Sequence, residues 1–193
     1  MLGVENPTDG LHFDGRTDRG IFLEALERHG APVSMYEAAI EAYLEELPAS
    51  LWATEGAILP GVSELLDALE TQPAAVGLAT GNVQRGAQLK LGHFGLWERF
   101  QAGGFGDDSV VRSEVVKRGM ERLAEVSGAH ADPGQTVVIG DTPLDIEAGK
   151  AIGARVLAVA TGSYDVATLE SAGADWALED LSDTAGVLER LLG

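Results

Sequence analysis

The chain has 193 residues, no cysteine and 45% hydrophobic residues, which is enough apolar material for one sizeable core and a small second unit. Its 13 Lys and Arg residues stand against 31 Asp and Glu residues, so the formal net charge is −18. Because nucleic-acid binding depends on Lys and Arg neutralising phosphates, this balance argues against nucleic acid and anionic membranes as partners. The missing cysteines exclude disulfides, zinc–thiolate sites and thiol nucleophiles.

No targeting signal is predicted from the sequence. No apolar run approaches the ~18 residues that a membrane span needs. The first residues combine Pro, Gly and acids without the apolar stretch of a signal peptide. We therefore expect a cytoplasmic protein.

The first quarter of the chain has helical patterns. Apolar spacing predicts a helix over 18–29 that ends at Gly30. A second helix is expected to begin at a capping box formed by Ser34 and Glu37, and to stop at Pro48. This part of the chain therefore predicts an all-helical unit.

Beyond a connection at 48–61, predicted helices and strands alternate. The patterns indicate strands at 74–79, 136–140, 156–160 and 176–178, and helices that start near residues 60, 83, 112 and 143. Such alternation predicts an α/β fold with a parallel sheet covered on both faces. Ligands of these sheets bind at the carboxyl ends of the strands.

Thr80, Gly81 and Asn82 follow one predicted strand at that end. The Thr80 hydroxyl, together with the amides of Gly81 and Asn82 at a helix start, would suit an anion such as phosphate. The alternative is a plain helix cap and turn.

Asp141 and Asp145 follow the next long strand, in the segment GDTPLDIEAG. The spacing of four residues lets two carboxylates face one point, where they repel unless a cation lies between them, and hard oxygen ligands suit Mg²⁺. The alternative is a capping Asp141 and a solvated Asp145. Because the two motifs end successive strands, we favour a shared site.

The order of these motifs resembles the haloacid dehalogenase (HAD) superfamily, specifically its phosphoglycolate-phosphatase-like branch. The resemblance rests on the strand before Thr80-Gly81-Asn82, on VVIGDTPLDIEAGKAIGA, on PGVSELLDAL and LGHFGLWERF, and on the tail from RVLAVATG onward. It covers residues 60–190. It implies a parallel-sheet, Rossmann-like core at 56–193 and a small α-helical cap domain at 1–55.

The resemblance also implies roles for individual residues. Thr80 would bind the transferring phosphoryl group, with the amides of Gly81 and Asn82 beside it. Asp141 would be a direct Mg²⁺ ligand, and Asp145 would hold the metal or a metal-bound water.

Further positions are less closely fixed by the resemblance. The basic residue of the family's site would be Arg112, at the edge of a helix, or alternatively Lys117; an Arg departs from the usual Lys. Arg16 and Asp18 would face the site from the cap, unless Asp18 only caps its helix and Arg16 is a solvated charge. Lys90 is expected at the surface.

The nucleophile of the family has no counterpart in this sequence. The family uses an aspartate at the end of a central strand, in Asp-x-Asp-Gly-Thr, and the only near match is Phe13-Asp14-Gly15-Arg16-Thr17, which lacks the preceding apolar run. We interpret Asp14 as a cap-loop residue. About 25 to 30 residues of the family pattern, including the central strand, are expected to be missing at the amino end, which would leave a gap in the sheet.

Two functions fit these observations. The first is a Mg²⁺-dependent phosphomonoester hydrolase of a small phosphorylated metabolite, inactive without its nucleophile; the second is a non-catalytic phosphate- or metal-binding remnant of such an enzyme. A dehalogenase fits less well, because Asp141 and Asp145 are acids of a metal site that dehalogenases do without. The sequence indicates neither the substrate nor the oligomeric state.

Overall fold

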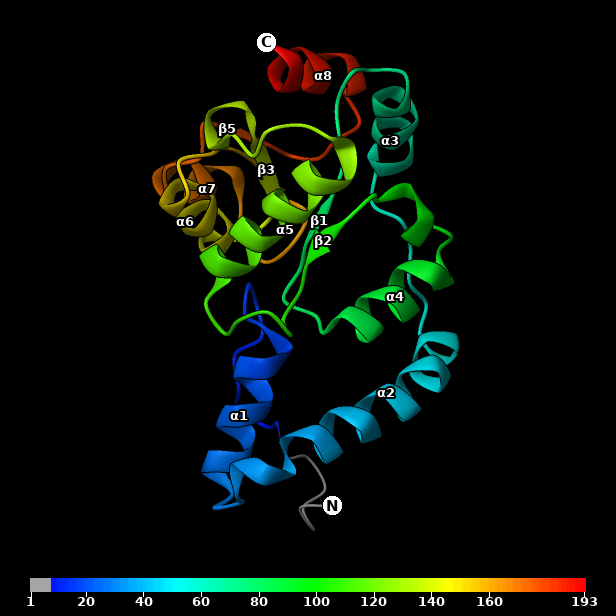
Figure 1. The fold of residues 1–193 in the computed structure, drawn as a ribbon, viewed down its shortest axis with the longest axis vertical. Helices are drawn as coiled ribbons and strands as arrows, with labels where there is room; N and C mark the ends of the chain where they lie inside the picture. The colour runs from blue at the N-terminus through cyan, green and yellow to red at the C-terminus, as the bar shows by residue number, and fades with distance from the viewer. Residues whose placement is uncertain (1–7) are drawn as a thin grey trace.

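The computed structural model describes residues 8–193 (Figure 1). Residues 1–7, where the helical unit predicted for 1–55 begins, lie outside the described residues. Helices α1 (Asp18–Arg28) and α2 (Tyr36–Ala53) lie at one end of the molecule, and the strands lie toward the other. Gly30 follows α1 with a φ of +64°, a left-handed conformation that ends a helix readily only with glycine.

Two details of the predicted helical unit are wrong. A short 3₁₀ turn over Val33–Met35 precedes α2, and no side chain caps either of these elements, so the capping box at Ser34 and Glu37 does not form. Helix α2 also continues through Pro48. Proline removes only one backbone donor, and the buried side chains of Leu44 and Leu47 hold this part of α2 against its neighbours.

The remainder alternates strands and helices, which confirms the predicted α/β class. In chain order the elements are α3 (Val62–Glu70), β1 (Leu78–Ala79), α4 (Gln84–His93), a 3₁₀ turn (Trp97–Arg99), β2 (Gly103–Gly104), α5 (Arg112–Ser127), a second 3₁₀ turn (Pro133–Gln135), β3 (Val137–Gly140), α6 (Pro143–Ala151), β4 (Arg155–Val159), α7 (Val166–Ser171), β5 (Trp176–Leu178) and α8 (Thr184–Leu192). The first strand is much shorter than the predicted range of 74–79, and β2 was not predicted.

The strands form two separate parallel pieces. Strands β1 and β2 pair with each other, and β3, β4 and β5 form a three-stranded sheet in that order. Within residues 8–193, no strand joins β1 to β3. Ile139 in the middle of β3 is 38% exposed, although strands of a parallel sheet are ordinarily covered on both faces.

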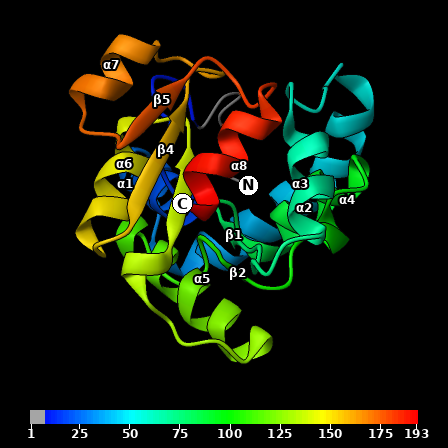
Figure 2. The same ribbon diagram turned by 90° about the horizontal axis from the view of Figure 1, so that it is seen from above.

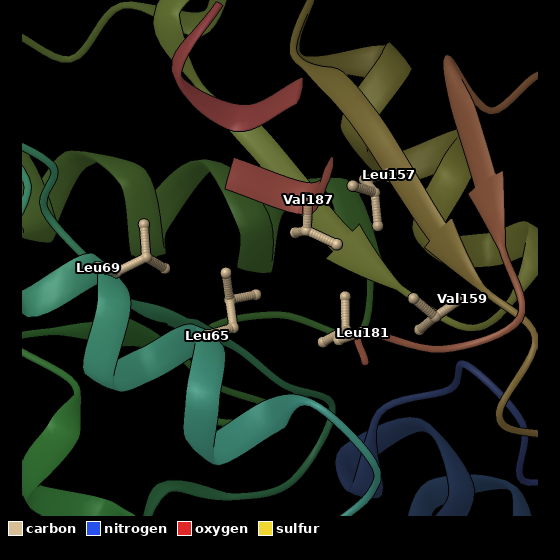
Figure 3. Packing of buried hydrophobic residues seen from close by; sticks show 6 residues of the cluster. All are labelled: Leu65, Leu69, Leu157, Val159, Leu181 and Val187. Atoms are coloured by element: carbon tan, nitrogen blue, oxygen red, sulfur yellow. The ribbon is translucent and has the colours of Figure 1, made fainter. Parts of the chain in front are cut away.

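The core is organised around β4, whose successive side chains point to opposite faces. Leu157 and Val159 pack on α3 and on the segment that leads into α8, in the cluster of Figure 3, which comprises Leu65, Leu69, Leu157, Val159, Leu181 and Val187. Val156 and Ala158 pack on the other face, with Ile146 of α6 and Leu169 of α7. Figure 2 shows α6 and α7 on one side of these strands and α8 on the other. Strand β4 is therefore covered on both faces.

The helical end joins the strand-bearing part through α4. Ile40 and Leu44 of α2 pack on Val83, the residue before α4, in a cluster that also includes Phe22, Tyr36, Tyr43 and Leu89. In the described part of the chain, no helix is long and apolar enough to span a membrane. The packing of α2 on α4 places α1 next to the loop that follows β1.

Candidate active site

The ends of β1 and β3 come together at the side chain of Arg112, the first residue of α5. Its Nη2 donates to the carbonyl oxygen of Ala79, the last residue of β1, at 3.1 Å. Nε and Nη2 donate to Oδ1 of Asp145, at 3.1 and 2.9 Å. One guanidinium therefore connects the end of β1 with the start of α6, which follows β3, and the ion pair is largely buried, with 17% of the Arg112 side chain and 7% of the Asp145 side chain exposed.

Asp145 is the third residue of α6 and belongs to a capping box. The side chain of Thr142 accepts from the Asp145 amide, and Oδ2 of Asp145 accepts from the amide and hydroxyl of Thr142, at 3.2 and 2.8 Å. The alternative considered from the sequence, a capping Asp141 and a solvated Asp145, is wrong: Thr142 is the cap, and Asp145 is buried. A Cβ added to Gly140 would lie 2.4 Å from that of Asp145, so glycine leaves room for this carboxylate.

Asp141 is half-buried beside this pair. Burial raises the pKa of its carboxyl above the ordinary value, the charges of Asp145 and Asp14 raise it further, and Arg112 acts in the opposite direction. A Cβ on Gly162, in the loop after β4, would lie 2.5 Å from Oδ2 of Asp141. The carboxylate therefore lies against a backbone that only glycine allows to come so close.

Asp14 lies near the acid pair. The following residue, Gly15, has a φ of +69°, and a Cβ there would lie 2.6 Å from Oγ1 of Thr142. The loop before α1 therefore rests on the start of α6. The sequence motif Phe13-Asp14-Gly15 drew attention to Asp14, but nothing in it predicted the proximity to Asp141.

The loop Thr80-Gly81-Asn82 follows β1, and the amide of Thr80 donates to the Gly104 carbonyl at 3.0 Å. Oγ1 of Thr80 accepts from the Asn82 amide at 3.2 Å. Within the described residues, neither the Thr80 hydroxyl proton nor the Gly81 amide has a hydrogen-bond acceptor. Both donors are therefore unpartnered in this part of the chain, where Thr80 is half-buried and Gly81 is buried.

The expectation that Gly81 and Asn82 open a helix is wrong. Helix α4 begins at Gln84, after its N-cap Val83. The Val83 amide donates to Oδ2 of Asp18 at 2.9 Å, and the Gln84 amide donates to the carboxylate of Asp107. Two carboxylates thus occupy the start of the helix, so the amides of Val83 and Gln84 are not free for phosphate.

The other candidate residues take different positions. Arg16 forms an ion pair with Glu24 at 2.7 Å, and Asp18 contacts the phosphate-loop candidates rather than capping α1, whose cap is Thr17. Lys117 is exposed on α5, one turn beyond Arg112. Lys90 is partly buried, contrary to expectation, because its Nζ donates to Oδ1 of Asn82 at 3.2 Å.

The donor set at the β3 end suits Mg²⁺ in part. Mg²⁺ is usually held by one or two carboxylates together with several waters and substrate oxygens. Asp141 offers one such carboxylate, whereas both oxygens of Asp145 are engaged by Arg112 and Thr142. Residues 8–193 contain no group of three or more His, Cys, Asp or Glu side chains placed to hold a metal.

The chain is similar to known proteins over most of its length. A family model described as haloacid dehalogenase-like hydrolase matches residues 8–159. The chain is 28% identical over 171 residues to the "Probable phosphatase IndB" of Dickeya dadantii, covering 86% of this chain and 68% of that protein. It is 27% identical over 135 residues to a phosphoglycolate phosphatase of Synechococcus elongatus, covering 70% and 61% of the two chains.

Solved structures share the fold. A hydrolase from Pseudomonas syringae superposes with a TM-score of 0.66 at 23% identity, covering 92% of this chain and 80% of that one. A β-phosphoglucomutase from Clostridium difficile superposes with a TM-score of 0.63 at 18% identity, covering 92% and 78%. At these identities the likeness concerns the fold.

Proposed function

This chain belongs to the haloacid dehalogenase-like hydrolase family, and on that premise we propose that it acts in the Mg²⁺-dependent hydrolysis of a small phosphorylated metabolite in the cytoplasm. The relative named as a phosphoglycolate phosphatase supports this class of substrate. The observation that carries the proposal is the position of Arg112, whose guanidinium contacts both Ala79 at the end of β1 and Asp145 at the start of α6. The free donors of the Thr80 loop and the acid pair therefore serve one site.

Each residue then has a chemical role. The Thr80 hydroxyl and the Gly81 amide bind oxygens of the phosphoryl group, and Arg112 offers it a cation. Asp141 would hold Mg²⁺, and Asp145 would join it when its oxygens are released from Arg112. The metal, when bound, neutralises phosphate charge and orients the group for in-line attack.

The attacking aspartate is proposed to come from a strand that lies between β1 and β3. Two observations support such a strand: the facing edges of β1 and β3 lack a strand partner among residues 8–193, and Ile139 on β3 is exposed. The arrangement of the core and of a helical cap, with the boundary near residue 55, is part of the same proposal. Asp14 is the competing candidate, since it lies near Asp141 but on a loop.

The decisive experiment compares two proteins. Residues 1–193 alone should not hydrolyse p-nitrophenyl phosphate with Mg²⁺, because among the described residues no strand between β1 and β3 carries a carboxylate to attack phosphorus. The same chain extended at its amino end by an apolar strand with Asp-x-Asp-Gly-Thr should gain both turnover and thermal stability. Hydrolysis by residues 1–193 that Asp14→Asn abolishes would instead make Asp14 the nucleophile.

Ligand binding tests the rest of the site. Thr80→Val should weaken orthovanadate binding by roughly 1–3 kcal/mol, the cost of leaving a charged oxygen without a partner. Isothermal titration should show weaker Mg²⁺ binding for Asp141→Asn. Asp132→Asn, which changes an exposed cap on another loop, is the matched control. Identical isotherms for the three proteins would remove Asp141 from the metal site.

A second candidate function is a non-catalytic phosphate-binding module. The observation that favours it is the saturation of Asp145 by Arg112 and Thr142, which leaves this carboxylate without a free oxygen for a metal. The extended protein separates the two candidates. A module of this kind would bind orthovanadate, but it would show no turnover even with the added strand.

A further inference from the structure

The loop that carries Thr80 is fastened to the first residue of α1. The amide of Asp18 donates to the Gly81 carbonyl at 2.7 Å. Its carboxylate accepts from the Val83 amide at 2.9 Å through Oδ2, and from the Asn82 Nδ2 at 3.2 Å through Oδ1. One residue of the helical end is therefore hydrogen-bonded to three consecutive residues after β1.

The Asn82 side chain links this carboxylate to a cation. Its Oδ1 accepts from Nζ of Lys90 at 3.2 Å, and that Nζ also lies 5.9 Å from the ring centre of Tyr43 on α2. A carboxylate only accepts hydrogen bonds and an ammonium group only donates them, so the amide of Asn82 has one possible orientation. Both ends of the side chain are used, and both bonds involve a charged partner.

The backbone of Asn82 sets the direction of the Thr80 hydroxyl. Because Oγ1 of Thr80 accepts from the Asn82 amide, its own proton is directed elsewhere. The Asn82 carbonyl is held in turn by the Gly106 amide at 2.8 Å. The amide, carbonyl and side chain of Asn82 are therefore all hydrogen-bonded. Because Asn82 is held in this way, the Thr80 hydroxyl and the Gly81 amide just before it have little freedom to move.

We infer that Asp18, Asn82 and Lys90 form a positioning relay, which holds the Thr80 hydroxyl and the Gly81 amide in the orientation that binds phosphate. The inference rests on the proposed function and assigns these three side chains no contact with the phosphate. It differs from the role that the resemblance implied for Asp18, which was to face the substrate. In the relay Asp18 acts through the loop, and Lys90 fixes the far end of the Asn82 amide.

A reciprocal exchange tests the relay. In Asp18→Asn, two amide NH₂ groups face each other, or Asn82 turns and presents its NH₂ group to Lys90. In Asn82→Asp, two carboxylates face each other. The double variant Asp18→Asn with Asn82→Asp restores every bond, because the new amide accepts from Val83 and donates to the new carboxylate, which accepts from Lys90. We expect each single variant to bind orthovanadate roughly 10-fold more weakly, and the double variant to recover most of the affinity.

Controls separate positioning from general stability. Asp183→Ala removes a similar cap from α8, far from the site, and should lower thermal stability without changing orthovanadate affinity. Asp18→Asn should also have a smaller effect when Thr80 is already Val, because the relay then positions only the Gly81 amide.

The possible failures differ in what they reject. If Thr80→Val weakens binding while Asp18→Asn and Asn82→Asp bind as the wild type does, or if the double variant fails to recover, the relay is wrong and the proposed function stands. If the wild type itself does not bind orthovanadate, the proposed function is wrong, and the relay fails with it.

Discussion

The two pieces of the sheet are built in different ways. In β3–β4–β5 the central strand carries the core, because Val156, Leu157 and Ala158 are fully buried between helices on both faces. The pair β1–β2 has two residues in each strand, and β2 consists of Gly103 and Gly104. Buried apolar side chains therefore stabilise β3–β4–β5, whereas β1–β2 has few apolar side chains to bury.

Helix α5 compensates for the missing side chains of the smaller piece. A Cβ on Gly104 would lie 1.9 Å from the Val115 carbonyl, so the backbone of β2 rests directly on the helix. Arg122 of α5 donates to the Gly103 carbonyl at 2.9 Å and forms an ion pair with Asp108. The same helix supplies Arg112 to the end of β1. The loop with Thr80 is therefore held in place by α5 rather than by the larger piece of the sheet.

The largest test of this difference is Arg112→Met. It should lower the free energy of unfolding by about 3–5 kcal/mol, because Asp145 would remain buried without its cation. Urea unfolding measures the loss. Arg118→Met on the same helix removes an exposed ion pair with Glu121 and should cost less than about 1 kcal/mol. Equal losses in the two variants would show that Arg112 does not join the two pieces.

A smaller effect is expected from Gly104→Ala. The added methyl would overlap the backbone of α5, and overpacking of this kind costs about 1–3 kcal/mol. Gly92→Ala in α4 is the control, since its Cβ would meet no atom within 4 Å and a helical alanine should stabilise by about 0.4–1 kcal/mol. Opposite signs would support direct contact between β2 and α5, and a tolerated Gly104→Ala would contradict it.

The smallest effect concerns the acid at the end of β3. Because burial and Asp145 raise the pKa of Asp141, the folded chain holds that proton more tightly than the unfolded chain does. Stability is therefore lost as the pH rises from the ordinary carboxyl range through the raised pKa. Without Mg²⁺, Asp141→Asn should raise the Tm at pH 7 by no more than roughly 2–4 °C, since solvent screens this half-exposed group.

The pH dependence provides the internal control for that variant. The difference in Tm between Asp141→Asn and the wild type should vanish near pH 3, where Asp141 is protonated in both the folded and the unfolded chain. A difference that stays constant from pH 3 to pH 7 would mean that the substitution acts through packing instead.

The sequence predicted the larger piece of the sheet better than the smaller one. Strands β3 and β4 are runs of β-branched and aliphatic residues, which indicate buried strands by themselves. Strand β2 has no such signal, because Gly103 and Gly104 become a strand only through contact with α5. The prediction that the second helix stops at Pro48 was wrong for a similar reason. The tertiary packing of α2 outweighs the local preference of proline to end a helix.

In the candidate site, too, some features were predicted from the local sequence and others depend on tertiary contacts. Asp141 and Asp145 were found because they follow a recognisable strand, and Arg112 was preferred to Lys117 from its place at a helix edge. The cap at Thr142 and the burial of Asp145 depend on hydrogen bonds that the motif does not fix. Lys90 was predicted at the surface, and its contact with Asn82, eight residues earlier in the chain, depends on the folded structure.

The exposed edge of β3 also bears on how copies of the chain behave together. Within residues 8–193 the edges of β1 and β3 offer unpaired backbone groups, and such edges are templates for pairing with another chain. A net charge of −18 opposes that association by repulsion between copies. Because the screening length falls from ~10 Å at 0.1 M salt to ~3 Å at 1 M, the repulsion weakens as salt is added. The colloidal stability of this chain should therefore depend on ionic strength far more than its folding does.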